Sequence, residues 1–253
     1  MPVPYQMRSC ITTNQRKYNM PGAILYQGPS NFDGKPIVVI AVWSSKNSKT
    51  GDMLQTYILR SDIDPRDANK YGEDESICGK CQHRGTPTFD PLKKLAKKRT
   101  CYVNMGQGVL IVYNTFKAGK YPVASPRTVG RKRKVRIGTY GDGAAAPDYV
   151  WSELIAEADG HTAYSHNGGD PQRYMVSADT LAQAMVAWSN NYRTFRIVRD
   201  VSEINRKHEV LCPASKEAGY KATCATCLLC GGTSVQAKSI AIPVHGSGAV
   251  HFQ

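Results

Sequence analysis

Two stretches in the first third of the chain predict neighbouring β-strands. Pro36–Trp43 suits a first strand, and Met53–Arg60 alternates apolar and polar residues as its partner would. The polar stretch SSKNSKTGD over Ser44–Asp52 has the composition of a turn between them. We therefore expect an antiparallel β element here. Residues 1–34 are rich in Asn, Gln, Gly and Pro and have little period, which predicts an irregular N-terminal arm.

In the second half, segments with strand patterns alternate with amphipathic segments. Helices are predicted at Pro147–Asp159 and Thr180–Asn190. Strands are predicted at Val135–Gly141, Gly160–His166, Arg173–Ser177, Tyr192–Val198, His208–Leu211 and Ser239–Pro243. This alternation indicates an α/β fold with a mostly parallel sheet, either open or a partial (β/α) barrel. Only Asn167–Gln172 separates the second and third strands, too few residues for a helical crossover, so either a helix is missing or the sheet is mixed there.

These patterns divide the chain into three regions. The arm over 1–34 is followed by a β element with a Cys-rich loop over 35–130. An α/β region with four C-terminal cysteines covers 131–253. The 253 residues are enough for one compact domain with a proper core, so we expect the last two regions to form one domain.

The four C-terminal cysteines have the spacing of a metal site. Cys224, Cys227 and Cys230 follow one another as C-x2-C-x2-C, and the more distant Cys212 precedes a proline. This arrangement is typical of a [4Fe-4S] cluster with a remote fourth ligand. A single zinc ion is the alternative, although zinc sites more often use two separated C-x2-C pairs. Unmetallated thiols or disulfides are the third possibility.

A second group of cysteines lies upstream. Cys78 and Cys81 form a C-x2-C pair, His83 follows, and Cys101 comes after a basic loop. Three thiolates and one histidine make a closed Cys3His zinc site, whereas three thiolates alone leave one metal position open for substrate or water. Cys10 is expected to be an ordinary free thiol.

The expected compartment favours bound metal over disulfides. Eight cysteines in 253 residues are too few for a disulfide scaffold, and the polar start MPVPYQMRSC does not resemble an export signal. No stretch approaches the roughly 18 apolar residues that a membrane span needs. We therefore expect a cytoplasmic protein without a membrane partner, in a reducing environment that keeps thiols available as ligands.

The net charge of +13 is concentrated in two blocks. A basic field of this kind attracts polyanions, and nucleic acid is the expected partner. Because no helix-turn-helix, RRM or finger signature accompanies the charge, recognition would be mainly electrostatic, and an ordinary solvated surface is the alternative. The blocks consist of Lys93, Lys94, Lys97, Lys98 and Arg99, and of Arg127, Arg131, Lys132, Arg133, Lys134 and Arg136.

Polar side chains follow the ends of several predicted parallel strands. Asp142, His166, Asp179 and His245 are in such positions. The carboxyl ends of parallel strands meet at one rim, where α/β folds place their active sites. We expect Asp142 and His166 to do acid–base work there and His245 to be available as a metal ligand. Asp179 is expected to cap the following helix instead. The alternatives are a turn or cap role for Asp142 and loop positions for the two histidines.

An ordered series of motifs resembles a group of uncharacterised bacteriophage proteins. The motifs are ICGKCQHRG, CYVN, RIGTYGD, HTAYSH, MVSADT, YRTFRIV, CPAS followed by TCATCLLC, and SIAIPVHG, and they cover about residues 36–246. The resemblance implies a phage origin and action in the cytoplasm of an infected bacterium, and it assigns no activity.

Two enzyme classes share single features with this chain. Radical-SAM enzymes combine a partial α/β barrel with a three-cysteine cluster, but their C-x3-C-x2-C spacing is absent here. Queuine-type base transglycosylases combine a barrel, catalytic aspartates and a Cys3His zinc site, which Cys224, Cys227, Cys230 and His245 would imitate.

The sequence therefore predicts an iron–sulfur or zinc protein that acts on nucleic acid, with base or nucleotide modification at the strand-end rim. A metal-stapled DNA- or RNA-binding accessory protein and a protein that binds a host factor are the alternatives.

Overall fold

The computed structural model describes residues 21–43, 47–246 and 248–252. Within them the chain forms an α/β structure with two five-stranded sheets, so the predicted fold class is confirmed. Cys10 and most of the predicted N-terminal arm lie outside the described residues.

The first sheet is mixed. Its order is β1-β2-β3-β4-β5; β1, β2 and β3 are antiparallel neighbours, and β3, β4 and β5 run parallel. The β2–β3 pair is the predicted antiparallel element. The strands are β1 (Gly22–Pro29), β2 (Pro36–Val42), β3 (Leu54–Arg60), β4 (Val135–Tyr140) and β5 (His161–Thr162).

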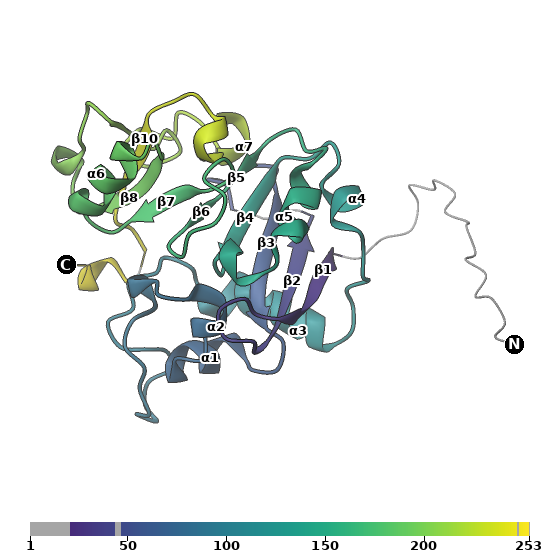
Figure 1. Cartoon of the computed structure of the whole chain (residues 1–253). Helices are drawn as coiled ribbons and strands as arrows, with labels where there is room; N and C mark the ends of the chain where they lie inside the picture. The colour runs from purple at the N-terminus through teal and green to yellow at the C-terminus, as the bar shows by residue number, and fades with distance from the viewer. Residues whose placement is uncertain (1–20, 44–46, 247, 253) are drawn as a thin grey trace, which may run out of the picture.

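The second sheet is parallel throughout, in the order β6-β7-β8-β10-β9. Only Ala163 separates β5 from β6, so one extended segment leaves the first sheet and enters the second, and the strands follow one another across the molecule (Figure 1). The two sheets do not close into a barrel over the residues described. The strands are β6 (Tyr164–Ser165), β7 (Met175–Ala178), β8 (Thr194–Val198), β9 (Glu209–Leu211) and β10 (Ser239–Pro243).

Seven α-helices surround the sheets in the described part of the chain. Two predicted helices are confirmed with shorter bounds, as α5, which follows Pro147, and α6, which is capped by Thr180. The helices are α1 (Pro65–Tyr71), α2 (Glu75–Cys78), α3 (Leu110–Lys117), α4 (Pro126–Gly130), α5 (Asp148–Ile155), α6 (Leu181–Ser189) and α7 (Cys224–Cys227).

The two sheets have cores of very different size. The first core joins β1–β4 with α3, α4 and α5, and it includes Trp151, whose indole N–H donates to the Gly143 carbonyl at 2.7 Å. The second core has only five buried members, and Cys212 is one of them. Cys224 and Cys230 pack against it as well. Cysteine side chains therefore take up part of the space that apolar residues would fill beneath the second sheet.

Three sequence expectations need correction or completion. The arm over 1–34 is not irregular throughout, because Gly22–Pro29 is β1 and pairs with β2. Between β6 and β7 the helix is missing and the strands are nonetheless parallel, joined by a short loop. Regions 35–130 and 131–253 share one sheet through the β3–β4 pairing. No helix in the described part of the chain has the length and apolar character to cross a membrane.

Gly141 is a sensitive position because it turns the chain from β4 into the loop that carries Asp142. Its φ is +82°, and an added Cβ would lie 2.7 Å from the Cβ of Ile58. Gly34 has a similar φ of +73° with nothing within 4 Å, which makes it a matched control.

We predict that Gly141→Ala lowers the free energy of unfolding by about 2–4 kcal/mol, because left-handed strain and overpacking add. Gly34→Ala introduces only the left-handed strain and should lower the free energy of unfolding by about 1–2 kcal/mol. Urea unfolding of both variants measures the difference. Equal losses would show that β4 and β3 do not approach as closely as described.

Candidate functional site

Side chains at the carboxyl ends of four parallel strands line one cavity of about 110 Å³, which we call the rim pocket. The lining comes from β4, β6, β7 and β8 and the residues that follow them, including Asp142, His166 and Asp179. The predicted meeting of strand ends is thus found for these strands. His245, which follows β10, lines a neighbouring cavity instead.

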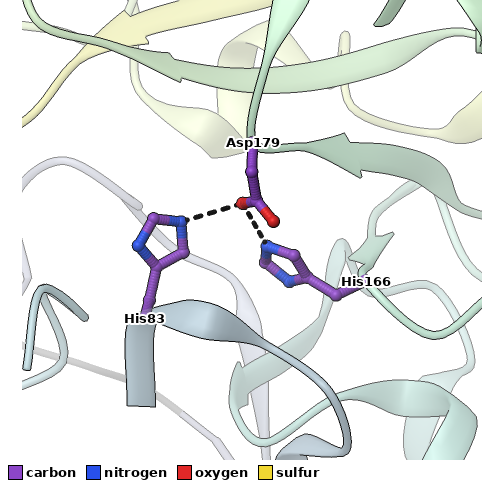
Figure 2. Close-up of side chains that lie close together, drawn as sticks. All are labelled: His83, His166 and Asp179. Atoms are coloured by element: carbon purple, nitrogen blue, oxygen red, sulfur yellow. Dashed lines mark hydrogen bonds and ion pairs between the residues drawn. The ribbon is translucent and has the colours of Figure 1, made fainter. Parts of the chain in front are cut away.

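The centre of the rim pocket is a carboxylate between two imidazoles. Asp179 Oδ1 lies 3.1 Å from His83 Nε2 and 3.1 Å from His166 Nε2 (Figure 2). These ligand atoms lie within 4.8 Å of one another, and in the described part of the chain no other set of His, Cys, Asp or Glu ligand atoms is grouped so closely. We call them the His–Asp–His cluster.

The prediction that Asp179 caps the helix is wrong. The N-cap of α6 is Thr180, whose side chain accepts from the Gln183 N–H while Gln183 reaches back in a capping box. That leaves the Asp179 carboxylate free to face the pocket. The T-x-x-Q spacing of Thr180 and Gln183 was visible in the sequence and would have assigned the cap correctly.

The surroundings of the cluster favour charge on both His166 and Asp179. Burial by itself lowers the pKa of His166, but the hydrogen bonds to Asp179 and Cys81 outweigh it and raise that pKa to about 10. Burial raises the pKa of Asp179, but the two histidines hold it well below its usual value. Without a bound metal, the pair is therefore an imidazolium and a carboxylate.

His83 is held on several sides. It is 5% exposed, and its Nδ1 lies 2.7 Å from Thr100 Oγ1, so that Nε2 points at Asp179. Its backbone carbonyl accepts from the N–H groups of Thr100 and Cys101. The ring of Phe252 stacks on it at 6.1 Å. These contacts fix both the position and the orientation of the imidazole.

The upstream cysteines Cys78, Cys81 and Cys101 line the same pocket. Cys81 Sγ lies 3.9 Å from His166 Nε2. Burial raises the pKa of both the Cys78 and the Cys101 thiol. The predicted group thus lines one pocket, but no three of its ligand atoms lie within 4.8 Å of one another in the described structure, and His83 is turned toward Asp179.

Two arginines hold the loops that carry these cysteines. Arg84 donates to Asp74 and to the carbonyls of Gly72 and Gly79, which fixes the C-x2-C turn. Arg99 donates to the carbonyls of Cys101 and Val103. Its guanidinium is thus used inside the fold, although the sequence analysis grouped it with the nucleic-acid-binding block.

Asp142 lines the pocket, but its carboxylate has its acceptor positions occupied. It accepts from the Ser165 hydroxyl at 2.7 Å, the Asn167 amide at 2.7 Å and the His166 N–H at 2.9 Å. The Ala144 N–H also donates to it, at 3.0 Å. These contacts make Asp142 an anchor that positions the His166 backbone. Acid–base work by Asp142 stays a prediction from its strand-end position.

Two polar side chains in the lining have no hydrogen-bond partner among the residues that the structure describes. They are the Tyr140 hydroxyl and the Ser177 hydroxyl, and Tyr140 is only 4% exposed. An unpaired buried hydroxyl is costly, so partners are expected from a ligand or ordered water in the pocket.

Three of the four C-terminal cysteines line a second cavity. Cys212, Cys224 and Cys230 line it together with Arg136 and His245. Burial raises the pKa of Cys230 to about 12, and neighbouring Cys212, Cys224 and Cys227 act in the same direction. No three of the four sulfur atoms lie within 4.8 Å of one another in the described structure. Tyr102, Tyr164, Phe195 and Ile197 form a wall shared with the rim pocket.

The two basic blocks differ in how their charges are used. Arg127 and Arg131 pair with Glu153 and Glu157, and Arg136 points inward to Tyr102 and Tyr164. The other members of that block, Lys132, Arg133 and Lys134, line an open groove with Arg131. Lys93, Lys94, Lys97 and Lys98 are all exposed, and none pairs with a carboxylate that the structure describes.

Comparisons of this chain with protein-family models, curated proteins and solved structures give no match.

The contacts of Asp142 predict a structural effect of its removal. Asp142→Asn places an amide against donors from Ser165, His166 and Asn167, and we expect the free energy of unfolding to fall by about 2–3 kcal/mol. Asp90→Asn, in the exposed basic loop, is the control and should change it by less than about 0.5 kcal/mol. Urea unfolding measures both, and a fully stable Asp142→Asn would contradict the anchoring role.

Proposed function

We propose that this protein is a metal-dependent enzyme whose reaction centre is the rim pocket, acting on a base or nucleotide of nucleic acid. The observation that carries the proposal is the His–Asp–His cluster, buried in a pocket at the carboxyl ends of parallel strands. Two imidazoles and one carboxylate form the ligand set typical of non-haem iron(II) sites with open positions.

The surroundings of the cluster suit a metal site. Thr100 contacts the second ring nitrogen of His83, and such outer contacts fix the orientation of metal-binding imidazoles. Asp179 and both histidines would hold a metal ion by three protein ligands, a number that leaves room for substrate or water. A metal bound there would supply a Lewis acid and a position for substrate or water. The unpaired hydroxyls of Tyr140 and Ser177 are then available to hydrogen-bond the substrate.

The loop with the exposed residues Lys93, Lys94, Lys97 and Lys98, which we call the lysine loop, supports nucleic acid as the substrate class. It continues the segment that carries His83 and ends before Cys101, so its charges are tied by the backbone to the pocket lining. Phe89, at the same loop, is 83% exposed. Free lysines bind phosphates, and an exposed aromatic ring is a stacking platform for bases of a single strand. This combination favours single-stranded nucleic acid over a duplex.

A second candidate centre in the same pocket is favoured by the placement of Cys78, Cys81 and Cys101. These three cysteines lie on the segments that follow β3, the first of the parallel strands, and they line the pocket. Three thiolates around an iron–sulfur cube leave one iron open, which is the feature shared with radical-SAM enzymes. In this case the His–Asp–His cluster would transfer protons or bind substrate instead of holding iron.

The phage origin and the host cytoplasm stay predictions from the resemblance of the motifs, and a host protein partner stays a separate prediction. The alternative is a non-enzymatic accessory protein that binds DNA or RNA, and this hypothesis differs from our proposal in one respect. It predicts no chemical change in a bound oligonucleotide.

We predict that metal-free protein binds Fe²⁺ or the probe Co²⁺ at the cluster under anaerobic conditions. Asp179→Asn removes the central ligand and should weaken this binding at least about 100-fold. Asp200→Asn, which alters a turn cap outside the pocket, is the matched control and should bind like wild type. Calorimetry and the ligand-field spectrum of Co²⁺ report the binding. Equal affinities of wild type and Asp179→Asn would rule out the cluster as the metal site.

We also predict a metal-dependent mass change in nucleosides from oligonucleotides incubated with the metal-loaded protein. Asp179→Asn should abolish this change and still bind the oligonucleotide, because the lysine loop is intact. Mass spectrometry of the digested product measures it. If DNA and RNA oligonucleotides both bind without any change of mass, the accessory-protein hypothesis is supported and the proposed enzymatic activity is contradicted.

The two basic blocks give a direct comparison for nucleic-acid binding. Replacing Lys93, Lys94, Lys97 and Lys98 by Gln should reduce the slope of log K against log salt by about 3 for a single strand, at about 0.7 per phosphate contact. Replacing Lys132, Arg133 and Lys134 by Gln should leave the slope close to that of wild type. Fluorescence anisotropy measures both. The reverse result would move the interface to the open groove.

A further inference from the structure

We infer that Cys212, Cys224, Cys227 and Cys230 hold an iron–sulfur centre that completes the core of the second sheet, with Arg136 and Arg193 balancing its negative charge. This inference does not depend on the proposed metal at the His–Asp–His cluster. Four observations carry it: the cavity among the cysteines, their spacing, two inward-pointing arginines without a carboxylate partner, and a small apolar core.

The positions of the cysteines suit a cluster better than a single ion. Four thiolates around one zinc ion lie about 3.8 Å apart, because each binds the same metal at about 2.3 Å in a tetrahedron. Cys212, Cys224 and Cys230 line one cavity, and no three of the four sulfur atoms come within 4.8 Å of one another in the described structure. Thiolates around an iron–sulfur cube are farther apart, since each binds a different iron. None of the four cysteines forms a disulfide.

Arg136 points into the molecule toward this group. Its Nη1 lies 3.9 Å from Cys224 Sγ, and its Nη2 donates to the hydroxyls of Tyr102 and Tyr164 at 2.7 and 2.8 Å. It has no carboxylate partner among the described residues. A guanidinium in such a place needs a compensating negative charge.

Arg193 also has no carboxylate partner among the described residues. It is 8% exposed, and its side chain donates only to the carbonyls of Gly232 and Lys238. Its Nε has no partner in the described part of the chain, and its charge is close enough to act on Cys227 and Cys230. A tetrathiolate centre has a net charge of about −2, which two arginines would balance.

The cavity also offers an unpaired hydroxyl. Thr162 Oγ1 is buried, lines the cavity and has no hydrogen-bond partner within the described residues. Hydroxyl and N–H donors to sulfur are a usual part of the surroundings of iron–sulfur centres and tune their potential. Thr162 on β5 and Arg136 on β4 would supply such donors.

The fold gives the centre a structural task. The second sheet has five buried core residues, and three of the four cysteines belong to that core or pack against it. A centre held by four thiolates would tie the end of β9 to α7 and the loop after it, where apolar contacts are few. Through Arg136 it also holds Tyr102 and Tyr164, which form the wall of the rim pocket.

The test is iron and sulfide content, with the absorption near about 400 nm, of full-length protein purified without oxygen or reconstituted with Fe²⁺ and sulfide. Wild type should bind both, and removal by a chelator should lower Tm by about 10 °C or more. Cys227→Ser should lose the absorption of this centre, whereas Cys10→Ser and Asp179→Asn should retain it. Asp179→Asn changes the rim pocket only. Loss of metal binding at the His–Asp–His cluster and loss of the iron–sulfur centre can therefore be measured separately.

A pair of arginine variants tests the charge argument without removing a ligand. Arg136→Lys keeps the positive charge and should retain the centre. Arg136→Met removes the charge and should weaken the centre by about 10- to 100-fold, seen as faster loss of iron to a chelator. Three results would overturn the inference: one equivalent of zinc without iron, a metal-free protein as stable as the reconstituted one, or equal iron loss from both arginine variants.

Discussion

The parallel pairing of β4, β5/β6, β7 and β8 is the constraint on which the rest of the structure depends. Parallel pairing directs the carboxyl ends of these strands to one rim, so Asp142, His166 and Asp179 meet although they are distant in sequence. His83 and the upstream cysteines reach the same place because their segment follows β3, which is parallel to β4. The pocket is therefore a consequence of topology, and its chemistry depends on which side chains stand just after each strand.

Charge is arranged around two centres on either side of one wall. In the rim pocket, a carboxylate lies between two imidazoles. The second cavity is lined by Cys212, Cys224, Cys230 and Arg136, and this arginine lacks a carboxylate partner among the described residues. The linings of both cavities include Tyr102, Tyr164, Phe195 and Ile197, so the two cavities are separated by a single layer of side chains. The proposed iron–sulfur centre would therefore share a wall with the proposed reaction centre.

Much of the α/β half could be predicted from the sequence because its strands are short apolar segments ended by polar residues. Ser239–Pro243 was predicted with the bounds of β10, and the strand ends with Asp142 and His166 were recognised as a rim. The segment predicted as one strand, Gly160–His166, is two strands, β5 and β6, which belong to different sheets and are separated by Ala163. No local sequence pattern indicates this change of sheet. β1 was missed because Gly and Pro at its ends resemble a loop, while its pairing with β2 decides its structure.

The site was predicted in part. His83, His166 and the cysteines were named from residue type and spacing, but Asp179 was set aside because a carboxylate before a helix usually caps it. The orientation of Arg99 and Arg136 could not be read from sequence, since a basic block looks the same whether its side chains face solvent or hold loops. The measurement that tests the central claim most directly is a crystal structure of the Co²⁺-loaded protein with anomalous scattering at the cobalt edge. Our account predicts a peak about 2.0–2.2 Å from His83 Nε2, His166 Nε2 and an Asp179 oxygen; a fully loaded crystal with no peak between these three atoms would contradict it.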